Sequence, residues 1–283
     1  MITEKERIIT EVMLEEYLDH LHKEERSSAT MDKYKRDLRK FMDFVGGQAV
    51  TKELTMAYKE ALKADYESSS VNSMLAAVNG FLSFFGWNDC KVKRLTIQRK
   101  VFCEVERELS KEEYFRLLEA SRELGQERIN LIIQTICGTG IRVSELKFIT
   151  VEAVKIGTVT VECKGKVRLV FIPKKLRKLL ETYIRKHGLE SGLVFVSRNG
   201  KPLNRSNIWR DMKALCVAAG VDAAKVFPHN LRHLFARTFY GLDNDIAKLA
   251  DILGHSNIET TRIYILSSGT DHRRQVERLG LVL

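Results

Sequence analysis

The chain has 283 residues, of which 44% are hydrophobic and 30% charged, as expected of a globular protein with one large or two smaller cores. No apolar run approaches the ~18 residues of a membrane span, and the charged start MITEKERIITEVML lacks a signal-peptide core, so we expect a cytoplasmic protein. The net charge of +10 is uneven, with 17 Lys+Arg against 16 Asp+Glu in residues 1–100 and 30 against 21 in residues 101–283. This surplus fits a polyanionic partner such as nucleic acid.

The first hundred residues are predicted to form four helices. Apolar residues recur at helical spacing over residues 8–24, and a second helix begins at a Ser28 or Thr30 cap and ends at the Gly46-Gly47 pair. Two more helices fit residues 51–63 and 69–85. We therefore predict a helical domain over residues 1–97. Residues 98–108 lack a helical period and are rich in charge, which predicts a linker.

Residues 109–283 are predicted to combine helices with a small sheet. A capping box of Ser110 and Glu113 begins a helix near 111–124, and helices near 127–138 and 143–149 follow. The alternating runs GTVTVEC and KVRLVFIP predict two strands joined by a tight turn at KGK. Further helices fit residues 174–187, 204–219, 229–240, 244–253 and 258–264. The fold class is therefore mainly α with a small β-sheet (α+β).

Two blocks of this second region supply basic side chains. GTGIRVSEL places Arg142 after a Gly-x-Gly turn, near a helix start. The KGK turn places Lys164 and Lys166 at a hairpin tip. A lysine there can donate a proton when a positively charged neighbourhood lowers its pKa.

Two later blocks add histidines, an arginine and a tyrosine. In HNLRH, His229 and Arg232 share one helical face, because side chains at i and i+3 are neighbours. His233 is expected off this face, in a structural role. In LGHSNIETTRIY, His255 follows a helix end and Tyr264 lies well inside the next helix.

Together these residues can transfer a phosphoryl group to tyrosine. A phenol has a pKa of ~10 and is a poor nucleophile at neutral pH, so it needs a base, an acid and an electrostatic clamp. Two arginines can hold the non-bridging oxygens of one phosphate and stabilise its transition state. His229 can accept the proton of Tyr264, Lys164 can protonate the leaving 5′ oxygen, and His255 can hydrogen-bond the phosphate. This chemistry requires neither a metal nor a cofactor, and the five scattered cysteines show no metal-ligand spacing.

In the blocks TGIRVSEL, KGK, HNLRH and LGHSNIETTRIY, the sequence resembles the tyrosine recombinases of the bacterial Xer and phage-integrase type. The resemblance extends to SSATMDKYKRDLRKF, which is similar to the family's core-binding segment, with Thr30, Tyr34, Asp37 and Leu38 in matching places. It covers nearly the whole chain. It implies an N-terminal helical core-binding domain and a C-terminal catalytic domain, residues 109–283, that ends in a tail.

The resemblance also implies a role for each residue of the set. Arg142 and Arg232 would form the phosphate clamp, with Lys164 as general acid, His229 as general base, His255 as phosphate ligand and Tyr264 as nucleophile. Glu145 would brace the reacting residues without itself taking part in the reaction. The KGK turn is shorter than the family's common GKGxKxR form, so Lys166 remains a rival to Lys164.

The implied partner is double-stranded DNA with inverted-repeat core sites, bound by a homotetramer that exchanges C-terminal tails. The reaction would pass through a 3′-phosphotyrosyl intermediate and exchange strands between two duplexes, in integration, excision, inversion or resolution. The candidate DNA contacts are Thr30, Lys33, Tyr34, Arg36, Lys40, Lys166 and Arg205. Two alternatives remain open: a type IB topoisomerase-like enzyme, and a DNA-binding regulator that keeps the fold without reacting.

Overall fold

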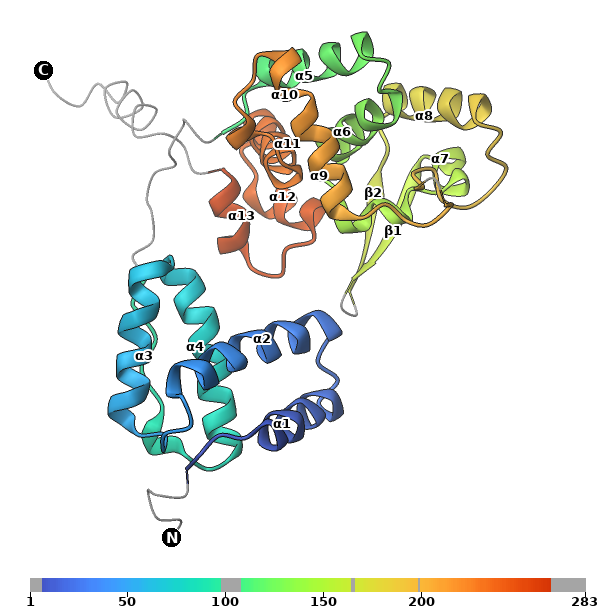
Figure 1. Ribbon diagram of the computed structural model, residues 1–283. Coiled ribbons are helices and arrows are strands. Elements are labelled where there is room, and N and C mark those ends of the chain that lie inside the picture. Colours follow the sequence, from blue (N-terminus) through green and yellow to red (C-terminus); the bar gives the residue numbers. More distant parts are fainter. Residues whose placement is uncertain (1–6, 98–107, 164–165, 198, 266–283) are drawn as a thin grey trace, which may run out of the picture. The chain divides into compact units, whose positions relative to one another are not determined.

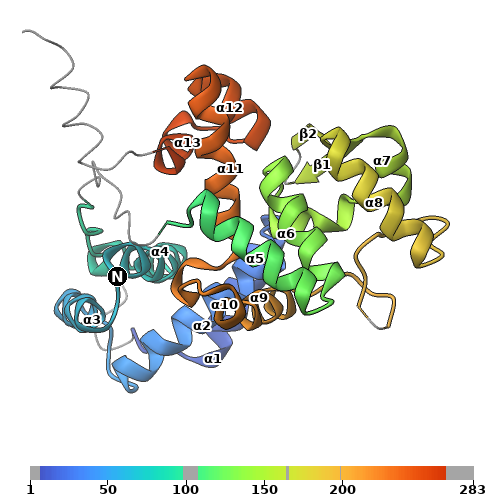
Figure 2. The ribbon, with the colours of Figure 1, turned by 90° about the horizontal axis from the view of Figure 1, so that it is seen from above.

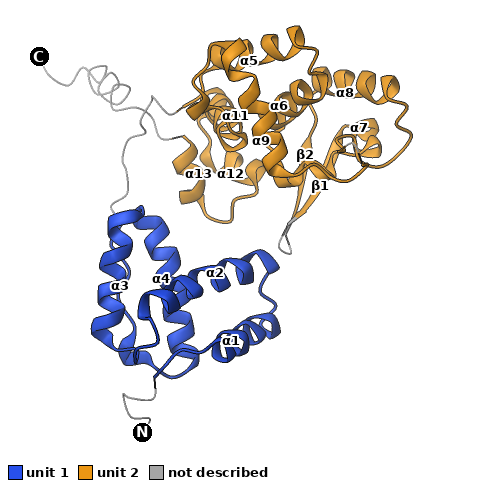
Figure 3. Ribbon diagram, viewed as in Figure 1, with its two compact units in different colours: residues 1–99 blue, residues 100–283 orange. Residues whose placement is uncertain are grey.

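The computed structural model describes residues 7–97, 108–163, 166–197 and 199–265, and the chain divides into two compact units, residues 1–99 and 100–283 (Figures 1 and 3). The fold is mainly helical with one two-stranded sheet in the described part, which confirms the predicted fold class. Within the same residues, no helix is both long and apolar enough to span a membrane. Lys164 and the tail after Ile265 lie outside the described residues, and so does the side chain of Lys166.

Unit 1 consists of the helices α1 (Glu11–Lys23), α2 (Ser28–Val45), α3 (Lys52–Asp65) and α4 (Ser68–Phe84), followed by the 3-10 turn η2 (Asn88–Cys90). The cap of α2 was predicted wrongly. Ser27 is the N-cap, because its extended backbone lets its hydroxyl accept from the amide of Thr30. Gly46 ends α2 as predicted, in the left-handed conformation that glycine adopts at little cost.

The chain after η2 is fastened to α4 by two asparagines. Asn79 donates to the carbonyl of Val92 and accepts from its amide, at 2.8 and 3.1 Å. Nearer the start of the same helix, Asn72 makes the same pair of bonds with Leu95, at 2.9 and 2.7 Å. An asparagine amide offers the donor and acceptor of a peptide group, so it can pair with extended backbone as a strand would. Unit 1 therefore continues at least to Leu95.

The first half of unit 2 comprises α5 (Lys111–Glu123), α6 (Glu127–Thr139), η4 (Val143–Phe148), α7 (Val151–Ile156) and, after the sheet, α8 (Lys174–Lys186). The predicted capping box is present at α5, where the backbone and side chain of Ser110 both pair with Glu113. The helix predicted over 143–149 is a 3-10 helix instead. The short α7, which begins at a Thr150 cap, was not predicted because its six residues carry little periodic signal.

The sheet pairs β1 (Thr158–Cys163) with β2 (Lys166–Phe171) antiparallel, and Cys163 lies opposite Lys166 at the tip. Successive side chains of a strand point to opposite faces. On β2, Val167, Leu169 and Phe171 are exposed, whereas Val170 is buried in the core. Arg168 shares the face of Val170, and this alternation turns it towards the interior of unit 2.

The second half of unit 2 contains α9 (Arg205–Ala214), α10 (Cys216–Ala219), η5 (Ala223–Lys225), α11 (Pro228–Asp243), α12 (Ile246–Leu253) and α13 (Ile258–Tyr264). The single helix predicted over 204–219 is interrupted at Leu215. Helices α11, α12 and α13 pack against one another (Figure 2). They enclose a small apolar cluster of Ala236, Leu249, Leu253 and Tyr264, separate from the main core of the unit.

Candidate active site

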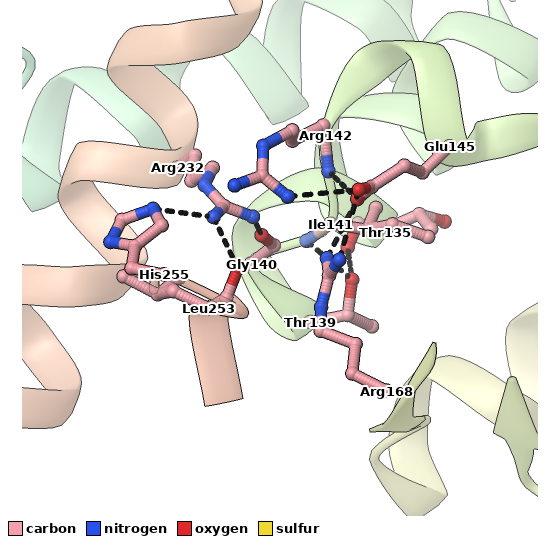
Figure 4. A network of polar contacts seen from close by, with 10 residues as sticks. All are labelled: Thr135, Thr139, Gly140, Ile141, Arg142, Glu145, Arg168, Arg232, Leu253 and His255. Atoms are coloured by element: carbon pink, nitrogen blue, oxygen red, sulfur yellow. Dashed lines mark hydrogen bonds and ion pairs between the residues drawn. The ribbon is translucent and has the colours of Figure 1, made fainter. Parts of the chain in front are cut away.

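Arg232 is the most deeply buried charge of the candidate site, with 1% of its surface exposed. From α11 its guanidinium donates to the carbonyl of Gly140, which caps α6, and at 2.7 Å to the carbonyl of Leu253, the last residue of α12 (Figure 4). The carbonyl end of a helix carries partial negative charge and unpaired acceptors. Two helix ends therefore hold this cation in one orientation.

Glycines make both of these helix ends possible. Gly140 has φ +66°, and a Cβ there would lie 2.5 Å from the ring of Phe235. Gly254, which ends α12, has φ +65°, and a Cβ there would lie 2.6 Å from Cδ of Arg168. Each position needs both the left-handed backbone and the absence of a side chain. The glycines of the blocks GTGIR and LGH thus let Phe235 and Arg168 pack against the ends of α6 and α12.

A second arginine cluster surrounds Glu145, which is 2% exposed. One carboxylate oxygen accepts from Nη1 of Arg142 and Nη1 of Arg168, both at 2.9 Å. The other accepts from the backbone amide of Arg142 at 2.8 Å and from Nη2 of Arg168 at 2.7 Å (Figure 4). Burial alone would raise the pKa of this carboxyl, but the hydrogen bonds from Arg168 and Arg142 outweigh it and lower the pKa to about 2.

Tyr264 lies at the end of α13, 6% exposed, among three histidines. Its ring centroid is 5.2 Å from that of His229, 4.1 Å from that of His233 and 5.1 Å from that of His255. The guanidinium carbon of Arg232 lies 5.9 Å from the same ring. The phenol is therefore next to the buried cation and within reach of several potential bases.

The hydrogen bonds of His255 define its tautomer. Its Nε2 lies 3.0 Å from Nη2 of Arg232, and its Nδ1 lies 2.9 Å from the hydroxyl of Thr261. A guanidinium can only donate, so Nε2 is the acceptor and Nδ1 carries the proton. The Nε2 atom thus faces the guanidinium of Arg232, while the hydroxyl of Thr261 holds the imidazole ring in place.

The histidines around Tyr264 are held in the neutral form. Burial, followed by the charge of Arg232, lowers the pKa of His229. Burial lowers the pKa of His233 and of His255 to about 4 in each case, with the neighbouring His229 and Arg232 adding to the effect. Arg232 itself has its pKa lowered to about 10, by burial and then by Arg142, so it remains a cation at neutral pH. A neutral imidazole can accept a proton, which a protonated one cannot.

The structure brings together five of the six residues predicted to react: Arg142, His229, Arg232, His255 and Tyr264. Glu145 braces Arg142 directly. The sixth, Lys164, lies outside the described residues, as does the side chain of its rival Lys166.

The sequence interpretation missed two neighbours of this site. His233 was expected off the face of His229, but it lies one helical turn away on that face, 4.7 Å from His229 between ring centroids. Arg168 was not singled out. The alternation of β2 could have indicated it, because a charged residue at an inward position of a half-buried strand requires a partner.

The candidate DNA contacts of unit 1 are surface residues that mostly have partners within the unit. The hydroxyl of Thr30 lies 2.8 Å from that of Ser27, Lys33 pairs with the buried Asp37, and Lys40 donates to the hydroxyl of Tyr66 at 2.6 Å. Tyr34 packs partly on the core, and Arg36 is exposed. In unit 2, Arg205 is exposed at the start of α9 and contributes to the lowered pKa of His229.

Comparison with known proteins places the chain in a family. The phage integrase family model matches residues 107–270, and the model of the phage integrase N-terminal SAM-like domain matches residues 14–88. The chain is 30% identical to tyrosine recombinase XerA of Pyrococcus furiosus, over 98% of this chain and 97% of that one. It is 31% identical to tyrosine recombinase XerC of Roseiflexus castenholzii, over 95% and 94%. The chain belongs to the phage integrase family.

Solved structures share the fold at lower sequence identity. XerH site-specific recombinase in a post-cleavage complex with palindromic difH substrate has a TM-score of 0.71 and 18% identity, covering 98% of this chain and 90% of that chain. A lambda integrase tetramer bound to a Holliday junction has a TM-score of 0.72 and 17% identity, covering 92% and 78%. The fold is thus that of tyrosine recombinases with an N-terminal SAM-like domain.

Proposed function

We propose that Tyr264 is the nucleophile with which this chain, a tyrosine-type site-specific recombinase, cleaves and rejoins duplex DNA. The observation that carries this proposal is the position of the Tyr264 ring, which lies 5.9 Å from the buried guanidinium of Arg232 and is surrounded by three histidines. A tyrosine that merely filled the core would not need a buried cation beside it. Here the cation is Arg232, which is held by the carbonyl ends of α6 and α12.

In the first step, the phenolic oxygen of Tyr264 attacks the scissile phosphorus. His229, neutral because burial lowers its pKa, accepts the phenolic proton. The bond to the 5′ oxygen breaks, and this oxygen leaves as a hydroxyl with a proton from Lys164, or from Lys166 if the acid lies there. The product is a 3′-phosphotyrosyl bond and a free 5′ hydroxyl.

Charge stabilisation in this step falls to the two arginines. Arg142, a third exposed at 34%, can reach a phosphate oxygen from the open side, while Arg232 supports the transition state from the buried side. Fixed cations in a partly water-excluded site stabilise developing negative charge strongly. His255 accepts from Arg232 through Nε2; once DNA displaces this contact, a shift of the imidazole proton to Nε2 lets His255 donate to a phosphate oxygen.

Rejoining reverses these events with a different strand. The 5′ hydroxyl of a partner duplex attacks the phosphorus of the phosphotyrosyl bond and gives its proton to the lysine that acted as acid, and Tyr264 leaves with the proton that His229 returns. The number of phosphodiester bonds is unchanged, so no external energy source is consumed. Exchange between two duplexes requires four protomers, which leads us to a homotetramer on inverted-repeat sites, joined by exchange of the C-terminal tails. In this assembly residues 1–97 bind DNA, residues 98–108 link the domains and residues 109–283 perform catalysis.

Covalent capture tests the proposal and identifies the DNA site in the same experiment. The purified chain is incubated with a library of random nicked duplexes and denatured, and the DNA attached to protein is sequenced. We expect enriched sequences with inverted repeats, and mass spectrometry should locate the attached nucleotide on Tyr264. The matched control is Tyr264→Phe, which removes only the phenolic oxygen and should form no adduct.

Three outcomes would contradict the proposal. An adduct formed by Tyr264→Phe would exclude this residue as the nucleophile. Binding without any adduct would favour a DNA-binding regulator. Relaxation of a supercoiled plasmid that lacks the captured site would favour a type IB topoisomerase-like enzyme.

A further inference from the structure

Arg168 and Arg142 share the carboxylate of Glu145 unequally. Arg168 binds both oxygens with its two terminal nitrogens, at 2.9 and 2.7 Å, whereas the side chain of Arg142 reaches one oxygen through Nη1 alone. The fourth bond to the carboxylate comes from the backbone of Arg142. A carboxylate accepts about four hydrogen bonds, so this one is saturated. Arg142 is thereby held by a single side-chain bond.

The charges of this group favour binding of an anion. Two guanidinium groups face one carboxylate, so the three residues carry a net positive charge that an isolated Arg142–Glu145 pair would lack. Arg168 is the inner cation, with 12% of its side chain exposed, and Arg142 is the outer one, at 34%. The excess charge is therefore available on the arginine that faces solvent.

The position of Arg168 is defined from both ends. It lies on the inward face of β2, and its aliphatic part packs so closely on Gly254 that any Cβ there would overlap with it. Gly254 immediately precedes His255. The same strand begins at Lys166, next to the tip that carries the candidate general acids. Arg168 thus links the hairpin, the carboxylate that braces Arg142, and the turn before His255.

We propose that Arg168 is a positioning residue of the recombinase: it occupies both oxygens of Glu145, so that Arg142 stays oriented for the scissile phosphate and its charge is not fully offset by the carboxylate. Without Arg168, the freed oxygen of Glu145 would draw Arg142 into a bidentate pair. That pair would offset the charge of Arg142 and turn its second nitrogen away from DNA. The inference rests on the proposed role of Arg142 in phosphate binding.

The proposal attributes the loss of reaction rate to the carboxylate of Glu145 once Arg168 no longer shares it, and the test uses this property. Single-turnover adduct formation is measured at saturating DNA, on a nicked duplex that carries the captured site, for Arg168→Gln, Arg168→Lys and the double variant Arg168→Gln/Glu145→Gln. We expect Arg168→Gln to lower the rate constant at least ~10-fold, because removing one partner of this buried charge pair leaves Glu145 free to bind Arg142. DNA affinity should stay within ~3-fold of the original protein. The double variant should recover most of the lost rate, because the unshared charge is gone.

Two comparisons make the result specific. Arg177→Gln, which removes an arginine paired with Glu181 at 2.8 Å on the surface of the same unit, is the matched control and should react at the original rate. Arg168→Lys keeps the charge but not the bidentate geometry, and it should fall between the original protein and Arg168→Gln. If Arg168→Gln proves unfolded by circular dichroism, Arg168→Lys and its double variant with Glu145→Gln take its place in the comparison.

The outcomes separate this inference from the proposed function. A double variant as slow as Arg168→Gln, or an Arg168→Gln rate within ~2-fold of the original, would overturn the role of Arg168 while leaving Tyr264 as nucleophile. Adduct formation by Tyr264→Phe in the same assay would instead overturn the proposed function itself.

Discussion

The imidazole of His233 lies almost flat against the phenol ring of Tyr264, with 4.1 Å between ring centroids and 18° between ring planes. Both residues belong to the small group of helices α11, α12 and α13, and the stack holds the end of α13 against α11. Burial and the neighbouring His229 lower the pKa of His233 to about 4, so the stacked ring is neutral. The position of the candidate nucleophile thus depends on a histidine that has no assigned part in the chemistry.

Acid should destabilise unit 2 partly through this histidine. The folded-state pKa of about 4 lies below the ordinary value of 6.5, so between these values the unfolded chain binds more protons. The stabilising contribution is complete above pH ~6.5 and is lost as the pH falls towards ~4. For a shift of this size it amounts to about 3 kcal/mol. His233→Phe keeps an aromatic ring without the titration, so it should lose less stability on acidification.

Urea unfolding at a series of pH values between neutral and pH 4 measures this difference. His187→Phe is the matched control, since His187 also lies close to a tyrosine, with 4.0 Å between its ring centroid and that of Tyr183. Equal acid sensitivity of His233→Phe and the unaltered protein would refute the assignment.

The identity of the general acid can be decided between Lys164 and Lys166. Lys164→Ala should slow cleavage by ~10²–10⁴-fold, because the 5′ oxygen would then leave without a proton. A substrate with sulfur at the bridging 5′ position needs no protonated leaving group, so it should restore cleavage by Lys164→Ala but not by Arg142→Ala. Adduct on a denaturing gel is the readout. Rescue of Lys166→Ala, together with an unimpaired Lys164→Ala, would move the role to Lys166.

DNA binding should weaken steeply with salt. Residues 101–283 carry 30 Lys+Arg against 21 Asp+Glu. If ~8 phosphates are contacted, affinity should fall ~10³–10⁵-fold between about 50 and 200 mM salt, because binding releases condensed counterions. Fluorescence anisotropy titrations over this range measure the slope. A flat response would argue against a mode in which the protein surrounds the duplex.

Gly254 should tolerate alanine poorly, and for a reason beyond its backbone. Gly254→Ala must adopt φ +65° and also displace Arg168, whose Cδ lies 2.6 Å from the added Cβ. Gly188→Ala is the matched control, with φ +60° and no atom within 4 Å of the added Cβ. Both variants incur about 1–2 kcal/mol of left-handed strain, and the overlap should make Gly254→Ala less stable by about a further 1–3 kcal/mol. Equal free energies of unfolding would mean that Arg168 moves aside freely.

The C-terminal tail, LSSGTDHRRQVERLGLVL, lies outside the described residues, and its docking on a neighbouring protomer stays a prediction. Deleting residues 272–283 should leave binding to a single site largely intact while weakening the cooperative joining of two sites. Gel mobility shifts with one-site and two-site DNA distinguish these effects. Equal loss of both would indicate that the tail packs on its own domain.

Local sequence signals were sufficient for much of the fold. The Ser110–Glu113 capping box, the Gly46 stop and the apolar stripes of the long helices appear in the structure, because caps and helical periodicity depend on residues within one or two turns. Weak local signals led to errors. The six-residue α7 was missed, residues 143–148 formed a 3-10 helix, and Leu215 interrupts what was predicted as one helix.

The sequence by itself determined which residues were predicted to react, because four short blocks hold the two arginines, two candidate lysines, two histidines and tyrosine of this set in an order typical of one family. Only the tertiary structure decided how these groups act on one another. Arg168 reaches Glu145 across 23 positions of the chain, and Arg232 reaches the carbonyl of Gly140 across 92. Such pairings depend on how β2 packs near η4 and how α11 packs on the end of α6, and no local periodicity encodes that packing. The burial that keeps His233 neutral against Tyr264 arises in the same way, since it depends on the surroundings that the folded chain builds around the ring.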